Sequence, residues 1–441
     1  MKKFTFYAVS LLLALCFLLT GCAKLENPAS FEVTSNGGTV VKIGNYLYFA
    51  NTYKGYSSLT DGDNKTNKTE LNSMYRTKLV DGDVAFNENG TNKNEEKVVG
   101  KIAGFEYSNI FVSGSTLFFT TPNIHKNSSS ENRFDLVSLF KVNADGTGLK
   151  ELLTTNETTN EFRMVKIDGD DYLLVRDGSN LYKIAMFKSN AKTTLVDNLT
   201  GIAFDKNENQ NVLYYTTARE DNLGGNVLNS INLKTAEKTP LRNEVSESFN
   251  LLSANNGTVY YTKSTANLDA YYYYNDFSNG ENSEKSLIYA TSISEFNILD
   301  EDVQNNKIVT YIFQDNLYID VLGNSSQEVV ITSEDECGKA KNVLLVDAEY
   351  VYFLTEKGIF RADYKQGNIQ KVASNASIKE KLCDKVDNYF YFYSSLEDGT
   401  TYYLHRASLN DVANGNIKVQ VVSQISDEEI EDIEETLEVR E

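Results

Sequence analysis

Residues 117–119 read Leu-Phe-Phe, and residues 139–153 read Leu-Phe-Lys-Val-Asn-Ala-Asp-Gly-Thr-Gly-Leu-Lys-Glu-Leu-Leu. The aromatic triplet, and the apolar, aromatic and basic residues that open the second stretch, are typical of half-buried β-strands. Asp145 and Gly146 are residue types that tight turns favour, and the apolar run after them predicts one more strand. The two stretches therefore indicate three successive strands of one antiparallel sheet.

Both stretches recur in strict alternation, which is the signature of a repeat architecture. The aromatic triplet has eight copies: Leu47-Tyr48-Phe49, Leu117-Phe118-Phe119, Tyr172-Leu173-Leu174, Leu213-Tyr214-Tyr215, Val259-Tyr260-Tyr261, Tyr311-Ile312-Phe313, Val351-Tyr352-Phe353 and Phe390-Tyr391-Phe392. The second motif follows each triplet, as Met74-Tyr75-Arg76, Leu139-Phe140-Lys141, Leu181-Tyr182-Lys183, Leu228-Asn229-Ser230, Ile288-Tyr289-Ala290, Leu317-Tyr318-Ile319, Ile359-Phe360-Arg361 and Leu404-His405-Arg406. Its first positions run from 74 to 404, so seven intervals average 330/7, about 47 residues, a period typical of four-stranded propeller blades.

Two further strands complete each unit. An apolar run and a tight polar turn such as Gly44-Asn45 precede the triplet; the runs are Val40 to Ile43, Ile110 to Val112, Arg163 to Ile167, Asn250 to Ala254 and Val343 to Val346. A last apolar run follows the second motif, at Leu149 to Leu153, Lys192 to Val196, Gln327 to Ile331, Asn368 to Val372 and Ile417 to Val422. We therefore predict four strands per unit, joined in sequence order.

Such sheets must stack face to face in a closed ring, because a single four-stranded sheet leaves two apolar faces uncovered. We predict an all-β fold, a β-propeller of eight four-stranded antiparallel blades. Seven blades are the alternative, because the second motif at Leu317 begins only 29 residues after the one at Ile288. Residues Phe31 to Val33 are a candidate extra strand on the last blade that would close the ring.

The alternation of an aromatic triplet, a Leu-Tyr-Lys-Ile strand and an Asp-Gly turn, clearest in Leu139 to Leu153 and Leu181 to Val196, resembles a known bacterial family. This is the family of prolow-density lipoprotein receptor-like β-propeller domains of unknown function. The likeness covers most of residues 40 to 424, and the pair Asn229-Ser230 departs from it. The resemblance implies the propeller fold and is nearly silent on chemistry.

The N-terminus has the pattern of an export signal that is cleaved off. Lys2 and Lys3 precede an apolar run that ends in Leu19-Thr20-Gly21-Cys22 and is too short to span a bilayer comfortably. It is similar to the signals of bacterial lipoproteins, which implies lipidation of Cys22 and a chain anchored to the membrane of the bacterial cell envelope on its extracytoplasmic side. We divide the chain into a signal peptide (1–21), a short linker (22–30), the propeller (31–424) and a C-terminal segment (425–441).

The C-terminal segment has a helical pattern. Ser426 and Glu429 form a capping box, and Ile430, Ile433 and Leu437 fall on one stripe. We predict a short acidic amphipathic helix, with an acidic tail that docks a partner as the alternative.

Charge and cysteine content limit the partners. Without residues 1–21 the chain keeps 62 acidic and 40 basic residues, a formal charge of -22, which makes nucleic acid an improbable partner. Two cysteines remain besides Cys22 in the mature chain, Cys337 and Cys383, and they lie 46 residues apart. Because this is close to one repeat length, adjacent repeats can bring them together as a disulfide, or they stay unpaired.

No residue set reaches a catalytic assignment, and we predict no cofactor and no metal site. The chain has two histidines, His125 in a polar loop and His405 in the aromatic slot of the second motif, where we expect a packing role. No nucleophile elbow, phosphate-binding glycine loop or His-Glu-x-x-His stretch occurs. The oxygen-rich segments 61–64 and 168–171 suggest calcium, but backbone turn chemistry is the better interpretation of both.

Loop length is the better functional signal. We predict long connections between the second and third strands of three units, at Ala50 to Ser73, Thr120 to Ser138 and Thr262 to Ser286. Long loops on a rigid scaffold commonly carry recognition. Tyrosines within them are candidate ligand-binding residues, or alternatively pack inward; they are Tyr53, Tyr56, Tyr271, Tyr272, Tyr273 and Tyr274.

These observations favour a lipid-anchored binding or interaction module that presents one loop-decorated face to a protein, peptide or glycan at the cell surface. The alternative is a propeller enzyme that acts on glycans or peptides through carboxylates in its central channel, which would require two acids within about 5 to 10 Å of each other. A structural accessory of an envelope complex is a third hypothesis.

Overall fold

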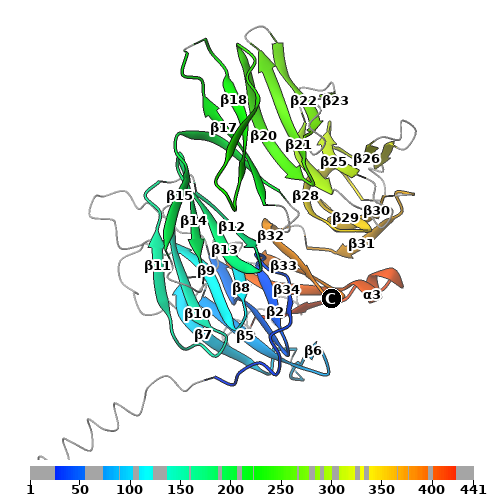
Figure 1. Cartoon of the computed structure of the whole chain (residues 1–441). Helices are drawn as coiled ribbons and strands as arrows, with labels where there is room; N and C mark the ends of the chain where they lie inside the picture. The colour runs from blue at the N-terminus through cyan, green and yellow to red at the C-terminus, as the bar shows by residue number, and fades with distance from the viewer. Residues whose placement is uncertain are drawn as a thin grey trace, which may run out of the picture.

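The computed structural model describes residues 25–54, 73–88, 90–102, 109–122, 137–157, 160–186, 191–205, 211–221, 223–265, 268–277, 284–288, 293–299, 307–322, 328–331, 337–364, 366–375, 377–395 and 401–423. This part of the chain forms an eight-bladed β-propeller (Figure 1). Each blade is an antiparallel sheet whose main strands follow one another in sequence order. The predicted fold class and blade number are confirmed, and the seven-bladed alternative is wrong.

The six blades in the middle of the chain hold four strands each. Blades 2 to 4 consist of β8 (Ile110–Ser113), β9 (Thr116–Pro122), β10 (Val137–Asn143) and β11 (Lys150–Thr154); β12 (Asn160–Ile167), β13 (Asp170–Asp177), β14 (Asn180–Ala185) and β15 (Lys192–Val196); β16 (Leu199–Phe204), β17 (Val212–Ala218), β18 (Asn226–Asn232) and β19 (Lys238–Arg242). Blades 5 to 7 consist of β20 (Glu247–Asn255), β21 (Thr258–Thr265), β22 (Leu268–Asp276) and β23 (Lys285–Ile288); β24 (Ser294–Leu299), β25 (Lys307–Phe313), β26 (Asn316–Leu322) and β27 (Glu328–Ile331); β28 (Ala340–Val346), β29 (Tyr350–Thr355), β30 (Gly358–Asp363) and β31 (Ile369–Ala373).

The first and last blades carry additional elements. Blade 1 contains β1 (Val33–Thr34), β2 (Val40–Ile43), β3 (Tyr46–Ala50), β5 (Ser73–Val80), β6 (Asp83–Val84) and β7 (Glu95–Ile102). Blade 8 contains β32 (Ile378–Val386), β33 (Tyr389–Ser395), β34 (Thr401–Ser408) and β35 (Val419–Val421), with β4 (Thr52–Lys54) added to it from the first blade. The short helix α3 (Leu409–Ala413) connects β34 to β35, and its N-terminus is capped by the Ser408 hydroxyl, which accepts from the backbone N–H of Asp411.

All eight predicted aromatic triplets lie in the second of the four main strands of a blade. In Leu117-Phe118-Phe119 every side chain is at most 1% exposed, although neighbouring side chains of a strand point to opposite faces. Both faces of each sheet are therefore covered, which is what stacking between two neighbouring blades requires. This explains why the triplets read as continuous apolar runs instead of alternating ones.

The basic residue of the second motif also has a repeated structural role. In four blades it lies over the ring of a tyrosine near the start of the second strand, an arrangement that favours the cation. The pairs are Arg76 over Tyr46 at 4.0 Å from the ring centroid, Lys183 over Tyr172 at 5.2 Å, Arg361 over Tyr350 at 4.2 Å and Arg406 over Tyr389 at 4.1 Å.

The first of the four main strands of each blade faces the centre of the ring. Neighbouring first strands contact one another at β2–β8, β2–β32, β16–β20, β24–β28 and β28–β32. Blades 1 and 8 therefore meet, with β2 against β32 (Figure 1). We call the contact between blades 8 and 1 the closing seam.

The segment that precedes β2 lies inside the ring. β1 pairs with β2 on its central side, with Val33 opposite Ile43. The Asn36 amide accepts from the backbone N–H of Val112 in blade 2 at 2.7 Å and donates to the Met164 sulfur in blade 3 at 3.3 Å. A small cavity of about 170 Å³ lies between these elements. This segment therefore fills part of the central channel.

Ring closure differs from the prediction. Phe31 to Val33 do not extend the last blade, because β1 pairs with β2 of blade 1. Instead β4 pairs with the first part of β34, with Tyr53 opposite Tyr402. β35 pairs with the second part of β34, so β4 and β35 together form the outer edge of blade 8. The connection after β3 thus reaches the last blade before it returns to blade 1.

The third strand of blade 5 is also not where the sequence placed it. The predicted motif at Ile288 belongs to the fourth strand, β23, and β22 is the third strand. Since β22 begins at Leu268 and β26 at Asn316, the third strands of blades 5 and 6 start 316 minus 268, or 48, residues apart. The apparent compression of blade 6 therefore came from a misplaced strand.

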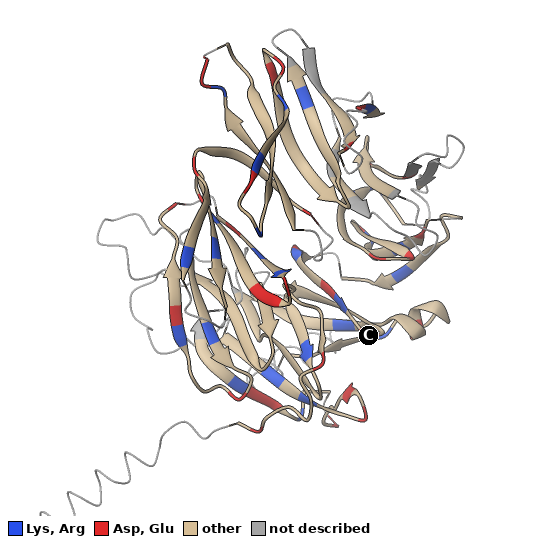
Figure 2. Ribbon diagram, in the orientation of Figure 1, with Lys and Arg blue, Asp and Glu red and all other residues tan. Residues whose placement is uncertain are grey.

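The predicted signal peptide, Cys22 and the helix predicted from Ser426 to Leu437 lie outside the described residues. Among the described residues, no helix is long and apolar enough to span a bilayer. Figure 2 shows acidic and basic residues interspersed over the strands of most blades.

Candidate functional site

The two ends of the ring differ in what they carry. The end that we call the loop face carries the connections between second and third strands and the links between blades. The end that we call the turn face carries the turns between first and second strands and between third and fourth strands. This follows from the up-and-down order of the strands in every blade.

On the loop face, two segments of blades 4 and 5 lie side by side. One is the connection from β17 to β18, residues 219–225, and the other is the link from β19 to β20, residues 243–246. The backbone N–H of Ser246 donates to the carbonyl oxygen of Gly224 at 3.2 Å, and the Ser246 hydroxyl donates to the carbonyl oxygen of Leu223 at 3.2 Å. The two segments therefore form one surface.

Arg219 organises this surface. One terminal nitrogen donates to the backbone oxygen of Asn243 at 2.9 Å, to its side-chain oxygen at 2.6 Å and to the backbone oxygen of Glu244 at 3.3 Å. The other end of the guanidinium pairs with Asp221. The hydrogen bond from Arg219, together with the backbone N–H of Leu223, lowers the pKa of Asp221.

A cavity opens beside Arg219, with a volume of about 280 Å³. Its lining is mostly polar and consists of Thr217, Ala218, Arg219, Glu220, Asp221, Val227 and Asn243. Two apolar side chains of the same segments are exposed, Leu223 at 55% and Val245 at 54%. An apolar pair thus lies on the segments that supply charged groups and the cavity, and we call this combination the blade 4–5 patch.

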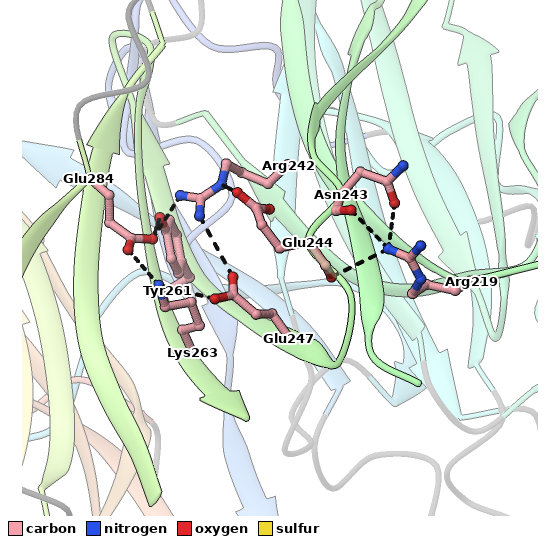
Figure 3. A network of polar contacts seen from close by, with 8 residues as sticks. All are labelled: Arg219, Arg242, Asn243, Glu244, Glu247, Tyr261, Lys263 and Glu284. Atoms are coloured by element: carbon pink, nitrogen blue, oxygen red, sulfur yellow. Dashed lines mark hydrogen bonds and ion pairs between the residues drawn. The ribbon is translucent and has the colours of Figure 1, made fainter. Parts of the chain in front are cut away.

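Behind the patch, a network of charges joins blades 4 and 5, and we call this contact the ionic seam (Figure 3). Arg242, 8% exposed, donates to Glu284 at 2.8 Å and Glu244 at 2.5 Å and lies 3.6 Å from Glu247. Lys263 is 2.5 Å from Glu284 and 3.6 Å from Glu247. The Tyr261 hydroxyl donates to Glu284 at 2.7 Å.

The network stabilises the charged forms of Arg242 and Glu284. Burial alone would lower the pKa of Arg242, but Glu284, Tyr261 and Glu244 outweigh it and raise that pKa. Burial alone would raise the pKa of Glu284, but hydrogen bonds from Lys263 and Tyr261 and the charge of Arg242 lower it. Burial and the neighbouring Glu284 carboxylate raise the pKa of the Tyr261 hydroxyl. Glu284 is therefore an ionised counter-ion at neutral pH.

Two acids of this network lie close together, but at the contact between blades 4 and 5, whereas the enzyme hypothesis places its carboxylates in the central channel. Lys263 lies 2.5 Å from Glu284 and 3.6 Å from Glu247, so the two carboxylates are at most 2.5 plus 3.6, or 6.1, Å apart. A glycosidase acid, however, needs a raised pKa so that it carries a proton. The lowered pKa of Glu284 removes it as a candidate proton donor.

Five of the six predicted tyrosines are among the described residues, and these five lie in strands. Tyr271 to Tyr274 belong to β22, opposite Tyr260 to Lys263 of β21, and all four are partly buried. Tyr274 stacks on Tyr260 with ring centroids 5.9 Å apart. The predicted long loop from Thr262 to Ser286 is therefore wrong, because β21 and β22 are separated by two residues only, 266–267.

Tyr53 lies in β4, is 6% exposed and packs edge-on against Tyr402 at 6.1 Å. Tyr56 lies outside the described residues. The other two predicted long connections are present, since β3 and β5 are separated by residues 51–72 and β9 and β10 by residues 123–136. The structure thus brings Tyr271 to Tyr274 together in one strand and places Tyr53 in blade 8, apart from them.

The cysteines, His405 and the turn at residues 168–169 have structural roles in the propeller. Cys337 and Cys383 lie in different apolar clusters and no disulfide joins them, so the structure lacks the bond considered from the sequence. His405 is buried and stacks on Phe392 at 5.6 Å, which confirms its packing role, and burial lowers its pKa to about 4. Asp168 and Gly169 have positive φ in the turn before β13, as turn chemistry predicts.

His125 and the acidic segment 61–64 lie outside the described residues. Within the described part of the chain, no group of three or more His, Cys, Asp or Glu side chains is arranged to hold a metal ion.

Sequence analysis missed the blade 4–5 patch. The stretch 219–225 reads Arg-Glu-Asp-Asn-Leu-Gly-Gly, a charged run with an isolated leucine and two glycines directly after a strand. Gly224 and Gly225 both have positive φ, which marks a defined turn. The available signal was an exposed leucine between a charged run and a glycine pair, which overall loop length does not reveal.

Comparison with known proteins assigns no family and no activity to this chain. No family model and no curated protein match the chain. Among solved structures, it is similar to a eukaryotic initiation factor at 9% identity, covering 91% of this chain and 90% of that one with a TM-score of 0.48. It is also similar to oligogalacturonate lyase from Vibrio parahaemolyticus, at 10% identity, 86% and 98% coverage and a TM-score of 0.44.

A prolyl endopeptidase is similar at 14% identity and a TM-score of 0.43, over 71% of this chain and 48% of that one, so the chain spans about half of the peptidase. It spans 61% of the TolB chain from Acinetobacter baumannii, at 11% identity and a TM-score of 0.32. The blade topology supports the resemblance stated from the sequence as far as the β-propeller fold, and membership of the receptor-like family stays a prediction.

Proposed function

We propose that this chain is a lipid-anchored, extracytoplasmic binding module whose blade 4–5 patch captures a segment of another protein. The anchor is the lipid that the sequence predicts on Cys22, and the location is the outer side of a bacterial membrane. The binding role rests on the loop face of a rigid propeller, since recognition commonly resides in loops on such scaffolds.

One observation carries the proposal. Leu223 and Val245 are each more than half exposed, and they lie on the two hydrogen-bonded segments that also present Arg219, Asp221 and the 280 Å³ cavity. Apolar side chains surrounded by polar groups are the usual composition of a protein contact. The many bonds of Arg219 to Asn243 and Glu244 hold the patch in shape before a partner arrives, which lowers the entropic cost of binding.

A peptide or protein fits this surface better than a glycan. Sugar rings commonly stack on exposed flat aromatic side chains, whereas the candidate ligand-binding tyrosines that the structure describes are part of β22 and β4. Aliphatic side chains next to an Arg–Asp pair instead suit a segment with an apolar residue flanked by charged or polar ones. Enzymatic use of the ionic seam is disfavoured because the lowered pKa of Glu284 leaves it without a proton to donate.

The test is selection of short random peptides by the purified chain displayed on its own lipid anchor. We expect enrichment of sequences with an apolar residue beside a charged one, and at least a tenfold loss of affinity in the double variant Leu223→Ser/Val245→Ser. Both side chains are exposed, so folding is expected to be unchanged.

Leu149→Ser is the matched control, because Leu149 is a similarly exposed residue, at 41%, on the turn face. Equal peptide binding by the chain and the double variant, or an equal loss in Leu149→Ser, would contradict the proposal.

A further inference from the structure

The N-terminal segment approaches the propeller on the turn face. The backbone N–H of Leu25 donates to the carbonyl oxygen of Asp145, in the turn between β10 and β11. Glu26 pairs with Lys78 at 2.7 Å, and the backbone N–H of Ala29 donates to the side chain of Asn45 at 3.0 Å. Lys78 is near the end of β5 and Asn45 is in the turn between β2 and β3, so all these contacts lie at one end of the ring.

Very little chain separates this face from the predicted anchor. Leu25 is three residues after Cys22. Because an extended chain spans at most about 3.6 Å per residue, a lipid on Cys22 would hold Leu25 within about 11 Å of the acylated residue. A tether this short leaves no room for the propeller to turn over on the membrane.

Most of the large apolar side chains that are exposed in the described part of the chain lie on this end of the ring. Of the six large hydrophobic residues that are more than 40% exposed among the described residues, four lie on the turn face: Phe31 at 47%, Val80 at 50%, Leu149 at 41% and Ile417 at 46%. Val80 ends the third strand of blade 1, and Leu149 and Ile417 follow the third strands of blades 2 and 8. These three blades are neighbours in the ring. The other two, Leu223 and Val245, form the blade 4–5 patch on the opposite face.

We infer that the turn face of blades 8, 1 and 2 rests on the lipid bilayer, with Phe31, Val80, Leu149 and Ile417 in the headgroup and upper acyl region. The inference rests on the proposed anchor at Cys22 and deepens it, since it fixes which face the membrane takes. As a consequence the blade 4–5 patch points away from the bilayer, into the space where a partner would be met.

The charges on this face suit neutral lipid. Lys150 follows Leu149 and Lys418 follows Ile417, and both lysines are exposed, as expected of residues that lie at headgroup level beside inserted apolar ones. Acidic residues are present as well, among them Asp83 and Asp387. The contact therefore depends on the apolar side chains and on the tether, and we do not expect it to require anionic lipid.

The test uses tryptophan as a reporter, because the chain contains none. Leu149→Trp and Ile417→Trp place single tryptophans on the turn face, and Leu223→Trp is the matched control on the loop face. The lipidated full chain is reconstituted into phosphatidylcholine vesicles with or without brominated acyl chains, which quench tryptophan on contact. We expect at least twofold quenching at positions 149 and 417 and an intensity ratio near one at position 223.

Quenching at position 223 equal to that at 149 and 417, or none at any of the three, would overturn the inference. Mass analysis of the N-terminal peptide reports separately whether Cys22 carries lipid.

If it does not, the anchoring proposal fails, and the same three reporters are measured with a hexahistidine tag in place of residues 1–22 on vesicles with nickel-chelating lipid. Selective quenching at 149 and 417 in that arrangement would support the turn face as a lipid-contacting surface without the anchor, and uniform absence of quenching would reject it.

Discussion

The closing seam and the ionic seam lie opposite each other in the eight-membered ring. Both contain ion pairs, which in the closing seam join Lys42 to Asp387 and Arg406 to Asp83, but the closing seam adds strand pairing and hydrogen bonds to backbone carbonyls. In the closing seam the Tyr393 hydroxyl donates to the carbonyl oxygen of Ala50 at 2.6 Å, Asn92 donates to that of Val422 at 2.9 Å, and β4 pairs with β34. In the ionic seam the contacts join the charged side chains of Arg242 and Lys263 to three glutamates.

The difference follows from how the chain joins the blades. The link of residues 243–246 connects blades 4 and 5, so their encounter costs little chain entropy and side chains are sufficient to fix it. Blades 8 and 1 come from distant parts of the chain. Backbone pairing fixes their register, because a wrong register would leave buried backbone groups without partners.

The largest expected effect comes from Arg242→Ala. The substitution removes the cation next to Glu244 and leaves Lys263 alone to neutralise Glu247 and Glu284. It should lower the free energy of unfolding by up to about 3 to 5 kcal/mol, as for other broken buried ion pairs. Thermal and urea unfolding measure it. Lys234→Ala, which removes the exposed pair with Asp168, is the control, with an expected loss below about 1 kcal/mol. Equal losses in the two variants would mean that the ionic seam is as solvated as the surface.

The two seams should respond differently to acid. Burial raises the pKa of Asp384 to about 6, although hydrogen bonds from Ser35 and from the backbone of Val40 and Lys385 oppose it. Because the folded pKa exceeds the unfolded value of 3.8, the stabilising contribution is complete below pH 3.8 and is lost as the pH rises through 6. Glu284 behaves oppositely: its contribution is present above its unfolded value of 4.5 and is lost as the pH falls through its lowered folded pKa.

Acidification from pH 7 to pH 5 should therefore strengthen the closing seam and leave the ionic seam intact. His405, also in blade 8, opposes this trend because its pKa is lowered to about 4. We therefore compare the chain with Asp384→Asn, in which His405 is unchanged. As the pH falls from 7 to 4, the free energy of unfolding of the native chain should rise by up to about 3 kcal/mol relative to that of Asp384→Asn. Parallel pH profiles in urea unfolding would show that Asp384 is not desolvated.

A smaller effect is expected from Tyr393→Phe, which removes one hydroxyl and leaves the buried carbonyl of Ala50 without that donor. The expected loss is about 1 to 2 kcal/mol, with faster proteolysis near both chain ends because the closing seam loosens. Tyr364→Phe is the control, since its hydroxyl donates to the carbonyl of Tyr350 within blade 7. If both variants lost equal stability and neither became more sensitive to protease, ring closure would not depend on this bond.

How far the sequence predicts the fold is clearest from blades 2 and 5. In blade 2, Leu139-Phe140-Lys141 follows the triplet and forms the third strand as expected, because the motif directly precedes an Asp-Gly turn. In blade 5 the third strand is the run that contains Tyr271 to Tyr274. The sequence alone leaves open whether these consecutive tyrosines form a recognition loop or pack inward. Each of them meets a partner in β21, from Tyr274 opposite Tyr260 to Tyr271 opposite Lys263. Alanine at these positions should therefore lower the melting temperature, contrary to the expectation for an exposed loop.

The blade 4–5 patch shows why sites are harder to predict than strands. Its residues come from two connections, and only the three-dimensional fold sets Arg219 against Asn243. β4 belongs to the same class, because a three-residue strand has no periodicity of its own and its partner β34 lies at the other end of the sequence. Local patterns therefore determined the blades, while contacts between distant segments determined the surface and the closure.

The pairing of β4 with β34 also bears on biosynthesis. The Ser423 hydroxyl donates to the carbonyl oxygen of Asn51, 372 residues earlier. A ribosome or an export channel releases the N-terminal part long before residue 423 emerges, so the outer edge of the last blade cannot be completed until nearly the whole polypeptide is available. Contacts of such sequence separation fold slowly, and until then an unsatisfied strand edge invites pairing with other chains. A chain truncated before β34 should therefore aggregate instead of folding into a propeller with fewer blades.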